Sequence, residues 1–378
     1  MKRGCVIGYD INEKGCQISY YDDSMEEPDT MMASSNNYLI PLVLGYFKDR
    51  WVFGKEAKRL AVVGEDCTET DLYGKAKRRE KVSLAGKTYD AVWLLAKYIS
   101  LTLQDFENIQ YLTFTTPETD VDMAKMLKGI GQHIGVDKEI INVQDYKESF
   151  CQYMIFQPKE LWQYESALFY CDEDRIKAYM LRKLRVDASH GMNSFVTVDE
   201  VANAQRKELE ALYPIMNKEK SPDESFKSMI ENVFEKKVIS SVYLTGEGFE
   251  KNWYPNSLRV LCNGRRAFMG NNLYSKGACY KSIRKCEPND DGPIYLDETK
   301  LTERICLRMR VDGQEGWYPL VTWGTHWYEA DGQWEVLLED ASDIEILVES
   351  LVDEEVQVEK VSLEGLPKRT DYSLRLQV

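Results

Sequence analysis

The sequence predicts an α/β protein built from two similar halves, followed by a β-rich tail. The main observation is an order of elements, strand, hairpin, helix, strand and helix, that occurs in residues 4–155 and again in residues 166–286. A second observation is a change of charge: residues 287–378 hold 22 acidic and 8 basic side chains, whereas the 41 acids and 40 bases before them nearly cancel. Two α/β halves of this form enclose a cleft between their hairpin turns, where we expect a site.

The first half begins with alternating apolar residues on either side of a turn at residues 10–15, which predicts a hairpin. A second strand pair follows, turned at Lys48-Asp49. The basic run 74–81 is then either a solvated loop or an anion-contacting one. The rest of this half reads as a helix from Thr88, a strand at 109–115, a helix capped by Thr119 and a strand at 140–143.

The second half repeats this pattern, with strands on either side of a turn at residues 172–175. Residues 199–213 read as a helix, and a further helix is expected to open at Pro222. An apolar strand then runs into Gly246-Glu247-Gly248, and residues 274–280 read as a tight turn into a helix. Two glycines after a strand let the backbone approach a flat or anionic ligand; the alternative is a turn that only connects a strand to a helix.

Composition narrows the classes of function. No apolar run reaches the roughly 18 residues that a membrane span needs. Nine cysteines without close pairs are expected to be reduced thiols, so we predict a cytoplasmic protein. The sequence has only three histidines, and they are far apart, so we do not expect a histidine-based metal site or catalytic triad. The acidic tail argues against nucleic acid as a partner.

Several short segments resemble motifs of the actin/sugar-kinase/DnaK-type chaperone superfamily, and among its members those of the DnaK-type chaperones most closely. These segments are Ile40–Val43, Trp51–Ala57, Leu112–Pro117, Ile140–Asp145, Leu244–Phe249 and Lys276–Ala278. The resemblance implies a duplicated actin-like ATPase-type fold, with two lobes around a cleft, followed by a C-terminal β-sandwich. The expected parts are lobe I at 1–160, lobe II at 161–286, a linker at 287–293, and at 294–378 a sandwich like a chaperone's substrate-binding β domain, without the family's helical lid.

The resemblance carries the family's functional residues to a few positions of this chain. The candidate catalytic residues are Asp10, Lys75 and Asp145. The candidate nucleotide-binding residues are Gly246, Glu247, Gly248 and Asp172. If catalysis is lost, an ion pair between Lys75 and Asp145 is the structural alternative for these two side chains.

The chain departs from the family at both turns that hold phosphates in family members. Asn12, Glu13 and Lys14 stand in the first turn, and the second turn is Asp172-Glu173-Asp174, without a glycine. Carboxylates at this position oppose a triphosphate. We therefore expect ATP or ADP with Mg²⁺ to bind weakly or not at all.

Three functions remain open at this stage. The first is a DnaK-like protein with a degenerate nucleotide site that acts as a protein- or peptide-binding or scaffold module, and the lack of glycine at the turns favours it. The second is a weakly active ATP-dependent chaperone that uses Asp10, Lys75 and Asp145. The third is a kinase of the same superfamily.

A protein or peptide client is the expected partner, rather than nucleic acid or a membrane. Four tryptophans of the tail, Trp317, Trp323, Trp327 and Trp334, fall around two predicted hairpin turns, at Asp312-Gly313 and Asp331-Gly332. They form either the core of the sandwich or a groove for an extended, apolar or basic peptide.

Overall fold

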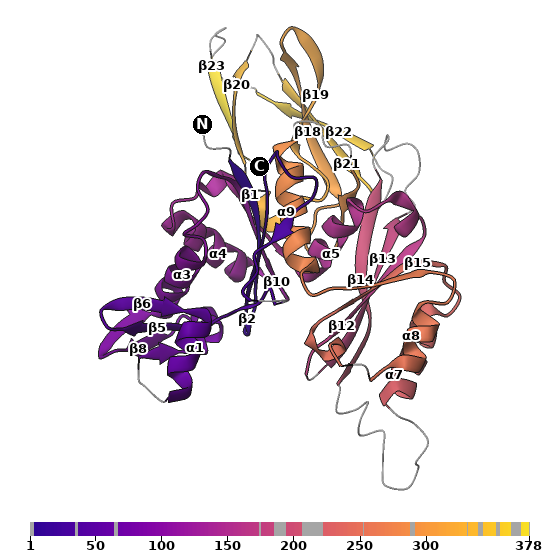
Figure 1. The fold of residues 1–378 in the computed structure, drawn as a ribbon. Coiled ribbons are helices and arrows are strands. Elements are labelled where there is room, and N and C mark those ends of the chain that lie inside the picture. Colours follow the sequence, from indigo (N-terminus) through magenta and orange to yellow (C-terminus); the bar gives the residue numbers. More distant parts are fainter. Residues whose placement is uncertain are drawn as a thin grey trace. The chain divides into compact units, whose positions relative to one another are not determined.

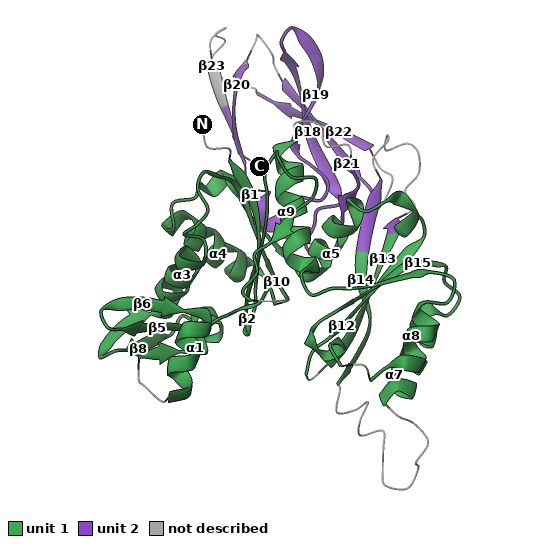
Figure 2. Ribbon diagram, in the orientation of Figure 1, with its two compact units in different colours: residues 1–182, 198–290 green, residues 183–197, 291–378 purple. Residues whose placement is uncertain are grey.

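The protein is a mixed α/β structure, as the sequence predicts (Figure 1). The structure is a computed structural model, and it divides into two compact units, unit 1 with residues 1–182 and 198–290 and unit 2 with residues 183–197 and 291–378 (Figure 2). The residues that it describes are 4–34, 37–63, 67–173, 175–184, 194–205, 222–251, 253–287, 292–330, 332–338, 343–352, 356–363 and 372–377. Most of the predicted linker, 288–291, lies outside these residues.

The first sheet of unit 1 has the strand order β11-β10-β1-β2-β3, with β4 also paired to β2. Strands β1 and β2 are antiparallel, whereas β1 with β10 and β10 with β11 are parallel. This confirms the predicted hairpin around residues 10–15. The strands are β1 (Cys5–Ile11), β2 (Gly15–Tyr21), β3 (Asp29–Thr30), β4 (Ile40–Pro41), β10 (Ile109–Thr116) and β11 (Ile141–Asp145).

The second sheet has the order β16-β15-β12-β13-β14, and β14 also pairs with the short β17 of unit 2. Strands β12 and β13 are antiparallel, whereas β12 with β15 and β15 with β16 are parallel. The two sheets therefore share one order and one set of directions in their four corresponding strands. The strands are β12 (Glu165–Cys171), β13 (Arg175–Leu184), β14 (Phe195–Gln205), β15 (Ile239–Thr245), β16 (Arg266–Met269) and β17 (Ile294–Tyr295).

Helix α9 packs against four strands of the first sheet, β1, β2, β3 and β10, and against α5 (Figure 1). Two glycines allow these contacts. A Cβ atom on Gly8 of β1 would lie 2.2 Å from the backbone nitrogen of Cys279, and one on Gly277 of α9 would lie 2.0 Å from the carbonyl oxygen of Ser149 in α5. The helices of unit 1 are α1 (Gly54–Val63), α2 (Leu72–Lys77), α3 (Ala91–Thr102), α4 (Val121–His133), α5 (Tyr146–Ile155), α7 (Pro222–Phe234), α8 (Pro255–Leu261) and α9 (Leu273–Cys286).

Smaller elements complete unit 1. The hairpin β5–β6 turns at Lys48-Asp49, as predicted, and both turn residues have positive φ angles. The elements are the sheet of β5 (Leu44–Phe47), β6 (Arg50–Phe53) and β7 (Thr68–Glu69), the hairpin of β8 (Lys81–Leu84) and β9 (Lys87–Asp90), and the 3₁₀ turns η1 (Lys138–Ile140), η2 (Lys159–Leu161) and η4 (Glu247–Phe249). None of the helices in the described ranges has both the length and the apolar character that a membrane crossing requires.

Two predicted helix starts are displaced. Thr88 belongs to strand β9, and α3 begins at Ala91 because the Asp90 side chain accepts a hydrogen bond from the Val92 N–H at 2.9 Å. Helix α4 is capped by Asp120 and not by Thr119, since its carboxylate accepts from the Met123 N–H at 2.7 Å. In both cases a carboxylate capped the first turn.

Three other predictions are wrong. The basic run was expected to be a loop, but its first residues form α2. Residues 199–205 belong to strand β14, because sheet pairing overrides a helical spacing of apolar residues; residues 206–213 lie outside the described part. Of the tight turn into a helix that was predicted at 274–280, the helix is confirmed as α9 and only the turn is wrong: Gly277 lies inside α9, where it permits close packing.

Unit 2 contains an antiparallel sheet with the order β19-β18-β21-β22 and a separate pair, β20 with β23. The predicted hairpin turn at Asp312-Gly313 is confirmed, with φ angles of 50° and 82°. At the second predicted turn Asp331 lies outside the described residues, and β20 pairs with β23. The elements are β18 (Glu303–Val311), β19 (Gln314–Val321), η5 (Trp327–Glu329), β20 (Gln333–Leu338), β21 (Asp343–Ser350), β22 (Val356–Ser362) and β23 (Tyr372–Gln377).

The tryptophans of unit 2 have different surroundings. Trp323 is buried in a small core with Phe195, and their rings meet edge to face. By contrast, Trp317 is 38% exposed and Trp327 is 58% exposed. The alternative of a wholly buried tryptophan core is therefore wrong for these two side chains.

Candidate functional site

In the first hairpin turn, between β1 and β2, a side chain accepts hydrogen bonds from the backbone of the turn itself. The side-chain oxygen of Asn12 accepts hydrogen bonds from the backbone N–H of Lys14, at 2.9 Å, and of Gly15, at 3.2 Å. The backbone N–H of Asn12 donates in turn to the Gly15 carbonyl at 3.0 Å. The side-chain amide oxygen of Asn12 therefore already accepts two of the N–H groups of this turn.

The second hairpin turn, between β12 and β13, has the same arrangement with a carboxylate. Asp172 accepts a hydrogen bond from the Arg175 N–H at 2.7 Å, and its own N–H donates to the Arg175 carbonyl at 3.0 Å. Glu173 is exposed beside them, and Asp174 lies outside the described residues. The Asp172 carboxylate repels an anion that approaches this turn, and it already accepts a hydrogen bond from the Arg175 N–H, so that N–H is not open to the anion.

Asp10 lies at the end of β1 and is 3% exposed. The Tyr146 hydroxyl donates to its Oδ1 at 2.7 Å, and the side-chain amide of Asn12 donates to that hydroxyl at 3.0 Å. Burial raises the pKa of Asp10 to about 7, and the hydrogen bond from Tyr146 opposes part of this rise. The carboxylate is therefore bound to an aromatic residue of the chain itself.

A stack of tyrosine rings continues from this contact. Tyr146, at the start of α5, lies parallel to Tyr274, at the start of α9, with ring centroids 3.7 Å apart and an angle of 6° between the planes. The ring of Tyr170, in β12, lies 6.3 Å from Tyr274. Burial raises the pKa of the Tyr146 and Tyr274 hydroxyls well above the usual range. Side-chain contacts thus run from Asp10 of the first hairpin to Tyr170 of the second.

The glycines after β15 accommodate the second hairpin. Gly246 has a φ angle of 100°, which side chains disfavour, and a Cβ atom there would lie 2.2 Å from the Cys171 carbonyl oxygen. A Cβ atom on Gly248 would lie 2.3 Å from the Cys171 sulfur. The N–H of Gly246 donates to the side chain of Asn271 at 3.0 Å. The close backbone approach that the sequence predicts for a ligand is made to Cys171.

Glu247, between these glycines, forms an ion pair with Lys14 of the first hairpin turn. Both side chains are close to half exposed, so solvent screens the pair and its contribution to stability is small. The pair nevertheless places a basic side chain of the first hairpin turn in contact with an acidic side chain of η4, which follows β15.

Lys75 and Asp145 have separate partners. The Lys75 ammonium lies 2.8 Å from the Glu69 carboxylate, and Glu69 is largely buried. Asp145 caps α5 by accepting from the Glu148 N–H at 2.8 Å, and its other oxygen lies 4.0 Å from the Lys147 ammonium. Among the described residues, Lys75 therefore pairs with Glu69 and not with Asp145, and the expected ion pair is wrong.

A family model, family of unknown function (DUF5716) C-terminal, matches residues 27–298, which is most of the chain. The chain belongs to this family. A second model, a domain of unknown function (DUF8552), matches residues 300–378. No match is found among the curated proteins. The DUF5716 match includes Tyr146, Asp172 and Tyr274 and begins after the hairpin that carries Asp10.

Sequence reasoning missed Asn12, Glu69, Tyr146 and Tyr274. An asparagine followed three residues later by a glycine is a local signal for a turn whose backbone N–H groups bond to the asparagine side chain. The role of Asn12 in the turn could therefore have been predicted from the sequence. Tyr146 directly follows a candidate catalytic residue, but its stacking on Tyr274 joins segments far apart in the chain. Only the packing of α5 against α9 brings the two rings together.

The described residues contain no group of three or more histidine, cysteine, aspartate or glutamate side chains that could bind a metal ion. The candidate site therefore consists of Asp10, the two self-capped turns and the tyrosine stack, which we call the tyrosine-filled site. Asp10, Asn12, Asp172 and the Tyr146 hydroxyl are hydrogen-bonded within the chain, whereas the Tyr274 hydroxyl is buried without a hydrogen-bond partner among the described residues.

Proposed function

We propose that this chain is a divergent, DnaK-like member of the actin/sugar-kinase/DnaK-type superfamily that has lost nucleotide-dependent catalysis. It acts as a protein- or peptide-binding or scaffold module. The common strand order of the two sheets in unit 1 supports two actin-like lobes. Helices α5 and α9, which carry the two stacked tyrosines, pack directly against each other.

The observation that carries the loss of catalysis is the Tyr146–Tyr274 stack bonded to Asp10. Stacked aromatic pairs contribute about 0.5–1.5 kcal/mol beyond the burial of their surface. A nucleotide that reached Asp10 would have to replace this stack and the hydrogen bond from Tyr146. It would also have to release the N–H groups that Asn12 and Asp172 hold.

The alternative, a weakly active ATP-dependent chaperone, requires Asp10, Lys75 and Asp145 to act on one nucleotide. Each of them has a structural contact instead: a buried hydrogen bond, an ion pair and a helix cap. A kinase of the same superfamily has the same requirement. We therefore favour the binding module.

Unit 2 supplies the proposed binding surface for an extended apolar or basic peptide. Strand β19 is an edge strand of its sheet and carries the exposed Trp317. An edge strand can pair with an added peptide strand, and an exposed tryptophan offers apolar area beside it.

Phosphate release in the presence of ATP and Mg²⁺ tests the loss of catalysis. Because Lys75 is engaged with Glu69, the wild-type chain is expected to release phosphate no faster than the Lys75→Ala variant. Circular dichroism of the variant checks that it is folded. A clear loss of turnover in Lys75→Ala would contradict the proposal and favour the ATPase alternative.

A further inference from the structure

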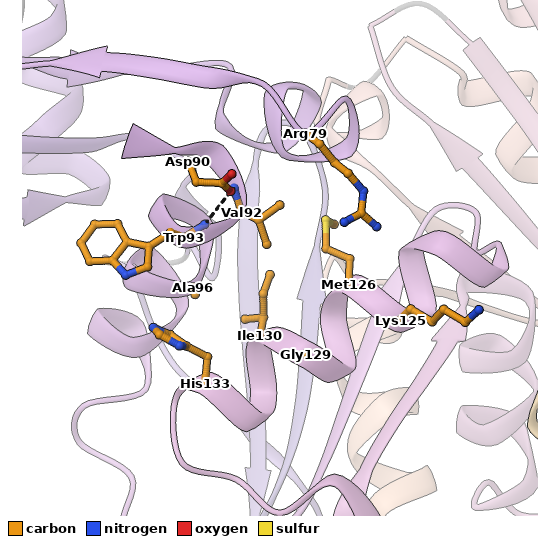
Figure 3. Close-up of a pocket in the computed structure, with 10 residues that line it drawn as sticks. All are labelled: Arg79, Asp90, Val92, Trp93, Ala96, Lys125, Met126, Gly129, Ile130 and His133. Carbon is orange, nitrogen blue, oxygen red and sulfur yellow. Dashed lines mark hydrogen bonds between the residues drawn. The ribbon is translucent and has the colours of Figure 1, made fainter. Parts of the chain in front are cut away.

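A groove of about 480 Å³ lies between α3 and α4, away from the tyrosine-filled site (Figure 3). Its volume is within the range of about 300–1,000 Å³ that is common for binding sites. It is open to solvent. The apolar lining residues are Val92, Trp93 and Ala96 of α3 and Met126, Gly129 and Ile130 of α4.

Three basic side chains, Arg79, Lys125 and His133, also line the groove. Within the described part of the chain none of the three has an ion-pair partner. In contrast, the neighbouring Arg78 pairs with two carboxylates, at 2.6 and 3.0 Å. The acid that lines the groove, Asp90, caps α3 and lies 3.3 Å from Lys81. The groove is therefore positively charged in a chain with a net charge of −15.

The close-up shows how these side chains surround the groove (Figure 3). Arg79 extends toward Met126, and the ring of His133 lies on the side of Trp93 and Ala96. Lys125 extends outward from α4. The cations Arg79 and Lys125 thus lie on one side of the apolar floor, and the imidazole of His133 lies on the other.

The wall formed by Trp93 is held in place by other rings. Trp93 is 38% exposed, and its ring is stacked on Tyr89 with centroids 5.5 Å apart and an angle of 11° between planes. Trp51 contacts both rings. Because its orientation is already fixed, this partly exposed tryptophan loses little conformational entropy when a partner binds. Tryptophans are also enriched among the residues that contribute most of the binding energy at protein interfaces.

Gly129 keeps the floor of the groove open. A glycine inside a helix costs about 0.5–1 kcal/mol relative to alanine. At Gly131 packing explains the glycine, because a Cβ atom would lie 2.6 Å from the Ile141 side chain. At Gly129 a Cβ atom would meet nothing within 4 Å. No contact among the described residues explains why this position is a glycine. A partner that lies in the groove would explain it, because the partner would need the space that a side chain would fill.

We propose that the α3/α4 groove binds a short acidic amphipathic helix of a partner protein. Its apolar side chains lie on Met126 and Ile130 against Trp93, and its carboxylates face Arg79, Lys125 and His133. An apolar groove between two helices accepts a third helix by its apolar face, and the unpaired cations select an acidic one. The inference goes beyond the proposed function, because it concerns another surface with the opposite charge preference and does not depend on the nucleotide site.

Binding of a labelled peptide to the full chain tests this proposal. The probe is a short helical peptide with leucine or phenylalanine at every third or fourth position and glutamate elsewhere, followed by fluorescence anisotropy. We expect saturable binding that weakens about tenfold in the double variant Arg79→Gln/Lys125→Gln. The matched control, Lys55→Gln/Arg59→Gln, removes two exposed charges of α1 and should bind as the wild type does.

Gly129→Leu tests the position of the peptide. Since the site has room for a side chain, this variant should fold, and its leucine should fill the groove and abolish binding. Gly129→Ala serves as a folding control and should melt at the same or a higher temperature than the wild type. The proposal is wrong if the acidic peptide does not bind the wild type or if Gly129→Leu binds it undiminished. It is also wrong if a peptide with lysine in place of glutamate binds equally well and loses that binding in Gly129→Leu, because the lysine peptide would then occupy the groove itself.

Discussion

At the end of β1, burial raises the pKa of Asp10 to about 7. An unfolded aspartate has a pKa of about 3.9. Between about pH 4 and pH 7 the folded chain therefore holds a proton that the unfolded chain has released. The contribution of Asp10 to the free energy of unfolding falls as the pH rises through this window and is constant above it.

Asp10→Asn removes this dependence, because asparagine does not ionise and still offers an oxygen to the Tyr146 hydroxyl. Above pH 7 the variant should be more stable than the wild type by a few kcal/mol, on the order of 1.4 kcal/mol for each pH unit of the window. Near pH 4 the two should differ little. Urea unfolding at several pH values measures the difference, and parallel stability curves for the two chains would contradict the assignment.

At the scale of the elements, the two helices α5 and α9 approach closely at one glycine. Gly277 faces the Ser149 carbonyl oxygen, and beside it the Glu148 carboxylate, which is almost fully buried, lies 2.8 Å from the Lys281 ammonium. Any side chain at position 277 must separate the helices. A separation would also disturb the tyrosine stack at their starts.

Gly277→Ala is therefore expected to lower the free energy of unfolding by about 1–3 kcal/mol, as substitutions that overpack a core do. Gly129→Ala in α4 is the matched substitution without a steric conflict and should be neutral or stabilising by about 0.5–1 kcal/mol. Thermal melting of both variants checks this contrast. Equal destabilisation by the two substitutions would show that the α5–α9 contact is not close.

Short sequence patterns predicted those turns and helix starts whose structure depends mainly on residues close together in the chain. The alternation around residues 10–15 and the Asp312-Gly313 turn gave the two hairpins, and Pro222 marked the start of α7. The helix predicted at 199–213 failed because pairing of β14 in the sheet outweighs local spacing.

The candidate site depended on contacts that local patterns do not contain. Gly246 and Gly277 were recognised as special positions, but the atoms they approach, in Cys171 and Ser149, come from other segments of the chain. The partner of Lys75 likewise became visible only when α2 and β7 were placed together. A single sequence indicates that a glycine is needed at a position but does not indicate which atoms lie next to it.

At the scale of the whole molecule, charge is unevenly distributed. The tail from residue 287 has 22 acids against 8 bases, whereas the α3/α4 groove in unit 1 presents the cations Arg79 and Lys125 beside His133. Electrostatic attraction between a charged surface and a charged peptide weakens as salt rises. The two proposed surfaces should therefore select peptides of opposite charge.

An apolar peptide with lysine or arginine should bind the full chain through unit 2, and binding should weaken at high salt. Trp317→Ala removes exposed apolar area beside the edge strand β19 and should lower the affinity several-fold, whereas Gly129→Leu should leave it unchanged. Anisotropy at low and high salt measures both effects. Binding that does not change with salt, or no binding, would contradict the electrostatic part of this prediction.

The central claim of the proposed function is that the chain's own tyrosines and turn side chains occupy the place where members of the superfamily that it resembles hold a nucleotide. Isothermal titration calorimetry of ATP with excess Mg²⁺ into the full chain tests it most directly. We predict no saturable heat at ATP concentrations up to the millimolar range, because Asp10, Asn12, Asp172 and the Tyr146–Tyr274 stack are already engaged. Saturable binding with a micromolar dissociation constant would contradict the claim.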